Sequence, residues 1–121
     1  MTSSSHGWIC YLEIPADDVA RSSGFYRDSF GWRLRTHGDG TVAFDDTSDG
    51  RAVSGMWVTG RPAMSEPGLV VSIMVDDVVA ASARVEQCGG VIVRPWDPDG
   101  PEKIAWFRDP GGNVLGLYEE P

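Results

Sequence analysis

Two residues in an alternating segment near the start of the chain, Tyr11 and Glu13, are the strongest candidates for chemistry. Side chains alternate between two faces along a strand, so both are predicted to lie on one face. A carboxylate on an apolar wall is desolvated, which disfavours its ionised form and suits a general acid or base. A structural role stays open as the alternative, in which Glu13 pairs with an arginine such as Arg33, Arg35 or Arg108, or is exposed at the mouth of the pocket.

Other strand-like segments place apolar and aromatic residues on what is predicted to be the same face. Val53, Gly55 and Trp57 alternate in one segment, and residues 70, 72 and 74 alternate in another. A largely apolar wall with few polar points is typical of small-molecule pockets. The predicted ligand contacts are therefore Trp57, Ser72, Met74, Trp106 and Tyr118. For each aromatic residue the alternative is that it fills the core.

The elements that would position these residues occur twice in the sequence. Residues 10–19 can be aligned with residues 69–78, since Asp18 and Asp77 are 59 positions apart, and the same shift relates Gly31 to Gly90. An aspartate before a helical segment can accept hydrogen bonds from the first turn, and a glycine after it tolerates a left-handed backbone. Each half is thus predicted to contain a strand, a capped helix and three further strands.

The predicted fold class is α+β, with two βαβββ modules forming a curved eight-stranded cup that has its helices outside. The whole chain, 1–121, is predicted to be one domain, with module one at about 8–58, a linker at 59–68 and module two at about 69–120. Helices are expected at 19–30 and 78–88. Strands are expected at 33–36, 41–44, 52–58, 91–94, 104–108 and 114–118, beside the strand at the start of each module.

Composition excludes several classes of function. The formal net charge is -8 and the ten Lys and Arg residues are scattered, which argues against nucleic-acid binding. No apolar run approaches the ~20 residues that span a bilayer, so no membrane association is expected. The first residues lack the pattern of a signal peptide, which predicts a cytoplasmic protein. Cys10 and Cys88 are predicted to be buried free thiols, as expected in a reducing compartment.

The segment Phe25-Tyr26-(x)3-Phe30-Gly31-Trp32, together with 109–113 (Asp-Pro-Gly-Gly-Asn), resembles the vicinal oxygen chelate superfamily. This superfamily contains glyoxalase I, extradiol dioxygenases and bleomycin-resistance proteins. The resemblance extends from about Trp8 to Glu119 and is greatest to the glyoxalase-related branch. It implies the cup-shaped fold and a small-molecule ligand.

The resemblance also implies four positions at which metal-dependent members hold a divalent ion. In this sequence those positions carry Tyr11, Gly55, Val70 and Gly116. Valine and glycine side chains cannot coordinate, and a neutral phenol is a poor ligand. No metal and no other cofactor is therefore expected.

Three functions follow as hypotheses. The first is binding of a small organic metabolite in an apolar cup, with metal-independent lyase or isomerase activity in which Glu13 is the acid or base and Tyr11 a hydrogen-bond donor. The second is non-catalytic sequestration of a drug or metabolite, as in antibiotic resistance. The third, a metal-dependent lyase or dioxygenase, is disfavoured by the missing ligands. A homodimer is expected, because members of this size usually pair and symmetric dimers are the commonest assembly.

Overall fold

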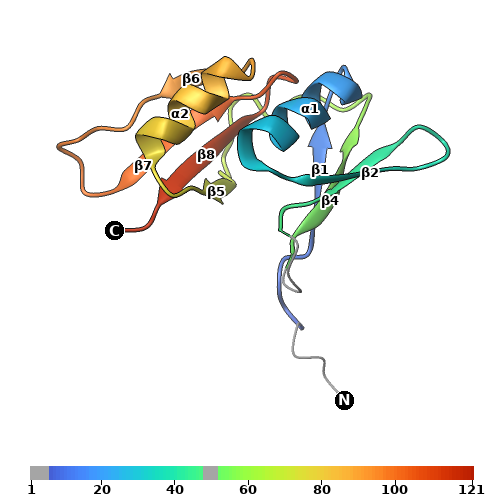
Figure 1. Cartoon of the computed structure of the whole chain (residues 1–121), viewed down its shortest axis with the longest axis horizontal. Helices are drawn as coiled ribbons and strands as arrows, with labels where there is room; N and C mark the ends of the chain where they lie inside the picture. Colours follow the sequence, from blue (N-terminus) through green and yellow to red (C-terminus); the bar gives the residue numbers. More distant parts are fainter. Residues whose placement is uncertain (1–5, 48–51) are drawn as a thin grey trace.

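The computed structural model describes residues 6–47 and 52–121 and has the predicted α+β class. Two βαβββ modules follow one another along the chain (Figure 1). Module one comprises β1 (Tyr11–Pro15), α1 (Val19–Phe30), β2 (Arg33–Thr36), β3 (Val42–Asp45) and β4 (Ser54–Val58). Module two comprises β5 (Ser72–Met74), α2 (Val78–Gln87), β6 (Val91–Arg94), β7 (Lys103–Arg108) and β8 (Val114–Glu119).

Each module forms its own open, four-stranded sheet. The strand orders are β1-β4-β3-β2 and β5-β8-β7-β6, so β1 and β5 occupy equivalent edges. In each sheet the first strand pairs in parallel with the last strand of the module, while the other neighbours are antiparallel. The repeat detected in the sequence is therefore a repeat of topology, and the prediction of two βαβββ modules is confirmed.

The signals that predicted the helices act as expected at three of the four helix ends. Asp18 accepts a hydrogen bond from the Arg21 amide at 3.1 Å, and Asp77 caps α2 in the same way. Gly31 ends α1 with a left-handed φ of 74°. After α2, Gly89 rather than Gly90 is left-handed, with a φ of 102°. Gly90 is instead needed for close packing, because an added Cβ would lie 2.7 Å from the Val85 side chain.

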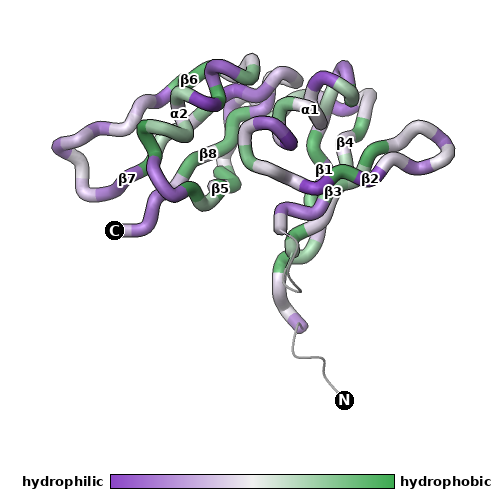
Figure 2. Tube along the Cα trace, viewed as in Figure 1, coloured by the Kyte–Doolittle hydropathy of each residue, from purple (hydrophilic) through white to green (hydrophobic). Residues whose placement is uncertain are grey.

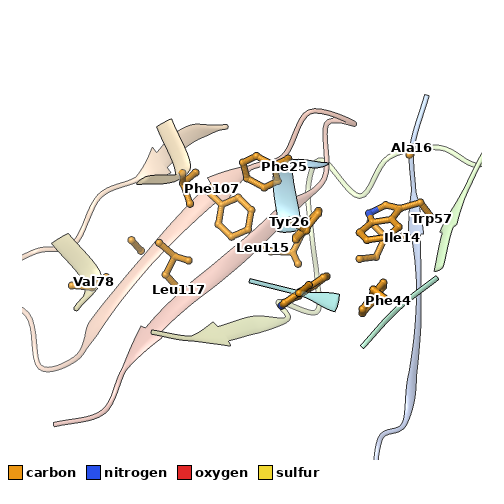
Figure 3. Packing of buried hydrophobic residues seen from close by; sticks show 13 residues of the cluster. Ile14, Ala16, Phe25, Tyr26, Phe44, Trp57, Val78, Phe107, Leu115 and Leu117 are labelled. Carbon is orange, nitrogen blue, oxygen red and sulfur yellow. The ribbon is translucent and has the colours of Figure 1, made fainter. Parts of the chain in front are cut away.

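A single cluster of buried apolar residues connects the two modules (Figure 3). Helix α1 packs on both sheets: Phe25 lies 5.8 Å from Phe107 of β7, and Tyr26 lies 5.8 Å from Trp57 of β4, measured between ring centroids. Apolar stretches follow β1, β5 and β8 in Figure 2, whereas the connection between β6 and β7 is hydrophilic. Each sheet thus has one face covered by its helix and the shared core, and one open face.

A buried carboxylate at the turn between β7 and β8 joins the modules. Asp109 is 3% exposed and accepts hydrogen bonds from the Tyr26 hydroxyl at 2.7 Å and from the backbone amides of Gly111 and Asn113 at 2.9 Å. The Asn113 side chain donates to Asp109 and to the Pro15 carbonyl, at 2.7 Å for the latter. These residues are called the Asp109 network below. It links α1, the end of β1 and the β7–β8 turn.

Two expectations from composition can be compared with the structure. Both cysteines are free, but Cys10 is exposed and Cys88 is half-buried, so the prediction that both are buried is wrong. Cys10 precedes β1 and therefore lies outside the packed part of the strand. Within 6–47 and 52–121, neither helix has the length and apolarity needed to cross a membrane.

Replacement of Tyr26 by Phe should destabilise the fold, because it removes a donor from a buried carboxylate. We expect the free energy of unfolding to fall by about 1.5–3 kcal/mol, the range for hydrogen bonds to charged groups. Chemical denaturation would measure it, with Tyr11→Phe as the control because Tyr11 is half exposed. Equal effects of the two substitutions would contradict the role given to the Asp109 network.

The same variant should alter the alkaline limb of the stability profile. Burial, together with the Asp109 carboxylate, holds the pKa of Tyr26 well above its ordinary value of 10.0. The unfolded chain releases this proton above pH about 10 while the folded chain retains it, so stability falls as pH rises through that range. In the Tyr26→Phe variant, which has no phenol to titrate at this position, the free energy of unfolding should fall less steeply above pH about 10.

Candidate functional site

A large cleft lies between the two modules, mainly on the helix-covered sides of their sheets. Its volume is about 1100 Å³. Small-molecule sites generally enclose roughly 300–1,000 Å³, so the cleft can hold a ligand of several fused rings.

The two walls of the cleft come from different modules and differ in character. The wall from module one is largely aromatic and contains Leu12, Phe30, Trp32, Phe44 and Val53. The wall from module two is aliphatic and contains Val71, Ile73, Val75, Ala80, Ala81 and Leu115. A flat apolar molecule would therefore have an aromatic surface on one side and branched aliphatic groups on the other.

A stack of three rings makes the aromatic wall rigid. Trp32 lies between Tyr26 and Phe44, with ring centroids 4.6 Å and 4.4 Å away and interplanar angles of 17° and 19°. The left-handed turn at Gly31 allows the chain to leave α1 and place Trp32 there directly. Gly55 completes the arrangement, because the Phe44 ring lies where a side chain at position 55 would be.

Polar side chains also line the cleft. They are Ser29, Asp46, Thr47, Ser72, Asp76, Asp77 and Arg84. The Arg84 Nε donates to the Asp28 carbonyl at 3.1 Å, which holds the guanidinium against the C-terminal end of α1. The Ser29 hydroxyl oxygen is buried and has no hydrogen-bond partner among the described residues. It is therefore a polar group that a ligand could satisfy.

Tyr11 and Glu13 lie together on the open face of the first sheet, as alternation predicted, and not in the cleft. The Glu13 carboxylate forms an ion pair with Arg61 of the linker, with 2.8 Å between Oε1 and Nη1. Its side chain is 43% exposed, so the desolvated setting expected for an acid or base is not found. The pairing matches the structural alternative in kind, although Arg61 was not among the expected partners.

The prediction that Gly55 and Trp57 share the face of Tyr11 and Glu13 is wrong. The parallel register pairs Leu12 with Gly55 and Ile14 with Trp57, which places Trp57 on the helix-covered face. Trp57 is 2% exposed and packs within the aromatic cluster (Figure 3). It is a core residue and does not line the cleft.

The remaining predicted contacts lie on the second sheet. Register places Ser72, Met74, Trp106 and Tyr118 on one open face, as expected. Ser72 and Met74 also line the cleft, and the Arg94 guanidinium lies 5.1 Å from the centre of the Trp106 ring. The structure thus divides the predicted site residues between two sheets that are not joined by strand pairing.

The residues at the four positions implied for a metal do not form a ligand set. Gly55 lies on the opposite face of its sheet from Tyr11. A side chain at Gly116 would overlap the Ser72 hydroxyl and lie 3.3 Å from Val70. Within 6–47 and 52–121 no group of three His, Cys, Asp or Glu residues is arranged to hold an ion. The residues present do not fit the metal centre of the metal-dependent relatives.

Sequence reasoning missed most of the wall residues of the cleft. Trp32 was named only as part of the family segment, but it is buried in the ring stack, at 5% exposed, and also lines the cleft. Ala80, Ala81 and Arg84 share one side of α2, and their spacing of three and four residues was an available signal. The cleft itself could not be predicted, because local sequence patterns do not show how one module packs against the other.

Comparisons with known proteins agree with this geometry. The family model described as the Glyoxalase/Bleomycin resistance protein/Dioxygenase superfamily matches residues 8–117. The chain belongs to this superfamily. A "Glyoxylase-like domain-containing protein" from Didymella fabae is 29% identical over 123 residues, covering 96% of both chains.

Two further relatives of this glyoxalase superfamily member have more specific names. The "Anthracycline biosynthesis protein DnrV" of Streptomyces peucetius is 29% identical, and the alignment covers 99% of this chain but only 50% of that protein. The crystal structure of TnmS3, an antibiotic binding protein from Streptomyces sp. CB03234, superposes with a TM-score of 0.65 at 25% identity. It covers 93% of this chain and 95% of that one.

Substitution of Gly55 by Ala should destabilise the glyoxalase-type fold by forcing Phe44 out of the ring stack. The added Cβ would overlap both the Phe44 ring and the Leu12 carbonyl oxygen. We expect a loss of about 1–3 kcal/mol or more, as for other overpacked cores, and a lower melting temperature. Gly38→Ala is the matched control, since a Cβ there meets no atom within 4 Å. A melting temperature unchanged by Gly55→Ala would contradict this account of the aromatic wall.

Proposed function

We propose that this protein binds a flat, apolar organic molecule in the cleft between its modules and acts by sequestering it. The observation that carries the proposal is the cleft itself: about 1100 Å³, with an aromatic wall facing an aliphatic one. Walls of this kind supply affinity through burial of apolar surface, while a few polar groups orient the ligand. The unpartnered Ser29 hydroxyl at the cleft is one such group.

The relatives support this choice of ligand class. TnmS3 is named an antibiotic binding protein, and DnrV is named for anthracycline biosynthesis. Most of the described side chains that line the cleft are aliphatic or aromatic, which favours binding over acid–base chemistry in the cleft. We therefore favour sequestration over the metal-independent lyase or isomerase.

If the protein is an enzyme, its active site would lie on the open face of the first sheet, at Tyr11 and Glu13. Its support is that both side chains lie on one face and are accessible. The two hypotheses make different predictions for Glu13→Gln. Sequestration in the cleft should not depend on this residue, whereas turnover of any substrate that needs Glu13 as acid or base should be lost.

Filling the cleft provides the direct test of sequestration. Ala80→Trp would project a large ring into the cleft from α2 and should weaken binding of a three-ring aromatic probe at least tenfold. Ala83→Trp is the matched control, because Ala83 is exposed on the same helix but does not line the cleft. Fluorescence titration, with Trp32 as a reporter in the wall, would measure the dissociation constants. Equal affinity of both variants and the unsubstituted protein would place binding elsewhere.

We also propose a homodimer, formed through the sheet edges at β1 and β5. Each of these strands pairs with one neighbour only, and three apolar side chains that also line the cleft are exposed beside these edges: Ile9 is 77%, Leu69 76% and Met74 57% exposed. An open edge flanked by apolar side chains is a surface prone to pairing with another chain. A second copy of this chain is the occupant that we assign to it.

Light scattering at micromolar concentration should give the mass of two chains. Leu69→Glu should shift the protein toward the mass of one chain, because the introduced charge would be buried at the proposed interface. Val91→Glu is the matched control, since Val91 is 52% exposed but lies on β6, at the opposite edge of the second sheet. A single-chain mass for the unsubstituted protein would refute the dimer.

A further inference from the structure

The charged residues around the cleft indicate the charge of the ligand. This inference rests on the proposed function, binding of an apolar molecule in the cleft. Among the residues that the structure describes, three carboxylates line the cleft, from Asp46, Asp76 and Asp77, against one guanidinium, that of Arg84. Asp46 follows β3 in module one, whereas Asp76 and Asp77 lie between β5 and α2 in module two. Negative charge is thus supplied by both walls.

The single cation is already engaged. The Arg84 Nε donates to the Asp28 carbonyl, and its charge also lowers the pKa of the Asp28 carboxyl, after the larger effect of the hydrogen bond from Arg27. Arg84 therefore lies at the negative end of α1, close to the Asp28 carboxylate. With three carboxylates against one guanidinium among the described lining residues, the charge around the cleft is net negative.

The three carboxylates are not equally available to a ligand. Asp77 caps α2, since its Oδ1 accepts from the amides of Val79 and Ala80. Asp46 uses one oxygen to accept from the Val53 amide at 2.8 Å and is exposed. Asp76 is exposed, and none of the four ion pairs found within the described residues includes Asp46 or Asp76.

We propose that the ligand is a cationic amphiphile: a fused-ring apolar body lies between the two walls, and a protonated amine at its edge is attracted by the carboxylates around the cleft, of which Asp46 and Asp76 do not cap a helix. The body obtains its affinity from the apolar walls, while the charge determines which apolar molecules are retained. An anionic molecule of the same shape would be repelled by the carboxylates of Asp46 and Asp76, which form no ion pair with another described residue, and would bind less tightly.

Three probes of similar size test this inference with the intact protein: 9-aminoacridine, which is cationic at pH 7, neutral 9-hydroxymethylanthracene and anionic anthracene-9-carboxylate. We expect the cation to bind more tightly than the neutral probe and the anion least tightly, with differences that shrink as salt is added. Asp46→Asn and Asp76→Asn should each weaken the affinity for the cationic probe by up to about fivefold, which is the range for exposed charge pairs. Neither should change the affinity of the neutral probe.

Two further variants distinguish the position of the charge from net charge alone. Glu102→Gln removes the same charge from an exposed residue that does not line the cleft, and it should leave all three affinities unchanged. Arg84→Gln removes a positive charge instead, so it should further weaken the affinity for the anionic probe. A Glu102→Gln effect equal to those of Asp46→Asn and Asp76→Asn would overturn the inference.

The outcomes separate the two proposals. If all three probes bind alike and Ala80→Trp abolishes their binding, the cleft is the site but the ligand is not selected by charge. If no probe binds, or if Ala80→Trp has no effect on binding, the proposed function itself fails and the inference fails with it.

Discussion

The carboxylate of Asp109 is the constraint on which the arrangement of the two modules depends. An ionised group that is 3% exposed would be strongly unfavourable without partners. Its partners come from its own turn and from α1 of the other module, through the Tyr26 hydroxyl. Satisfying this one charge therefore requires module one to pack against module two in a defined position.

Several features of the molecule follow from that packing. Asn113, held by Asp109, also accepts from the Met64 amide through its side-chain oxygen at 2.9 Å, so part of the linker is fixed as well. Tyr26 is held at one end by Asp109 and at its ring by the stack with Trp32. The same residue thus sets the relative position of the modules and supports the aromatic wall of the cleft.

The sequence was sufficient to predict the elements but not their contacts. Asp18, Asp77 and Gly31 act locally, on the helix ends beside them, so their effects could be deduced without knowing the rest of the fold. The face of Trp57 could not be deduced in this way, because it depends on the parallel register between β4 and a strand about 40 residues earlier. The walls of the cleft come from separate modules, and no local pattern encodes their approach.

The candidate site residues show the same division. Tyr11 and Glu13 were correctly placed on one face, since alternation within a strand is local. The partner of Glu13 is Arg61, from a linker with no regular structure to predict its path. For Ser72 and Met74, alternation predicts the open face, but their place in the lining of a cleft depends on how the two modules approach each other.

The Asp109 network also bears on how far the two halves of the chain could replace each other. When Asp18 is aligned with Asp77, the position of Tyr26 in α1 corresponds to Val85 in α2. The second half therefore has no phenol at the position that donates to Asp109. A protein made of two copies of the second half would lack the donor that helps to hold the modules together.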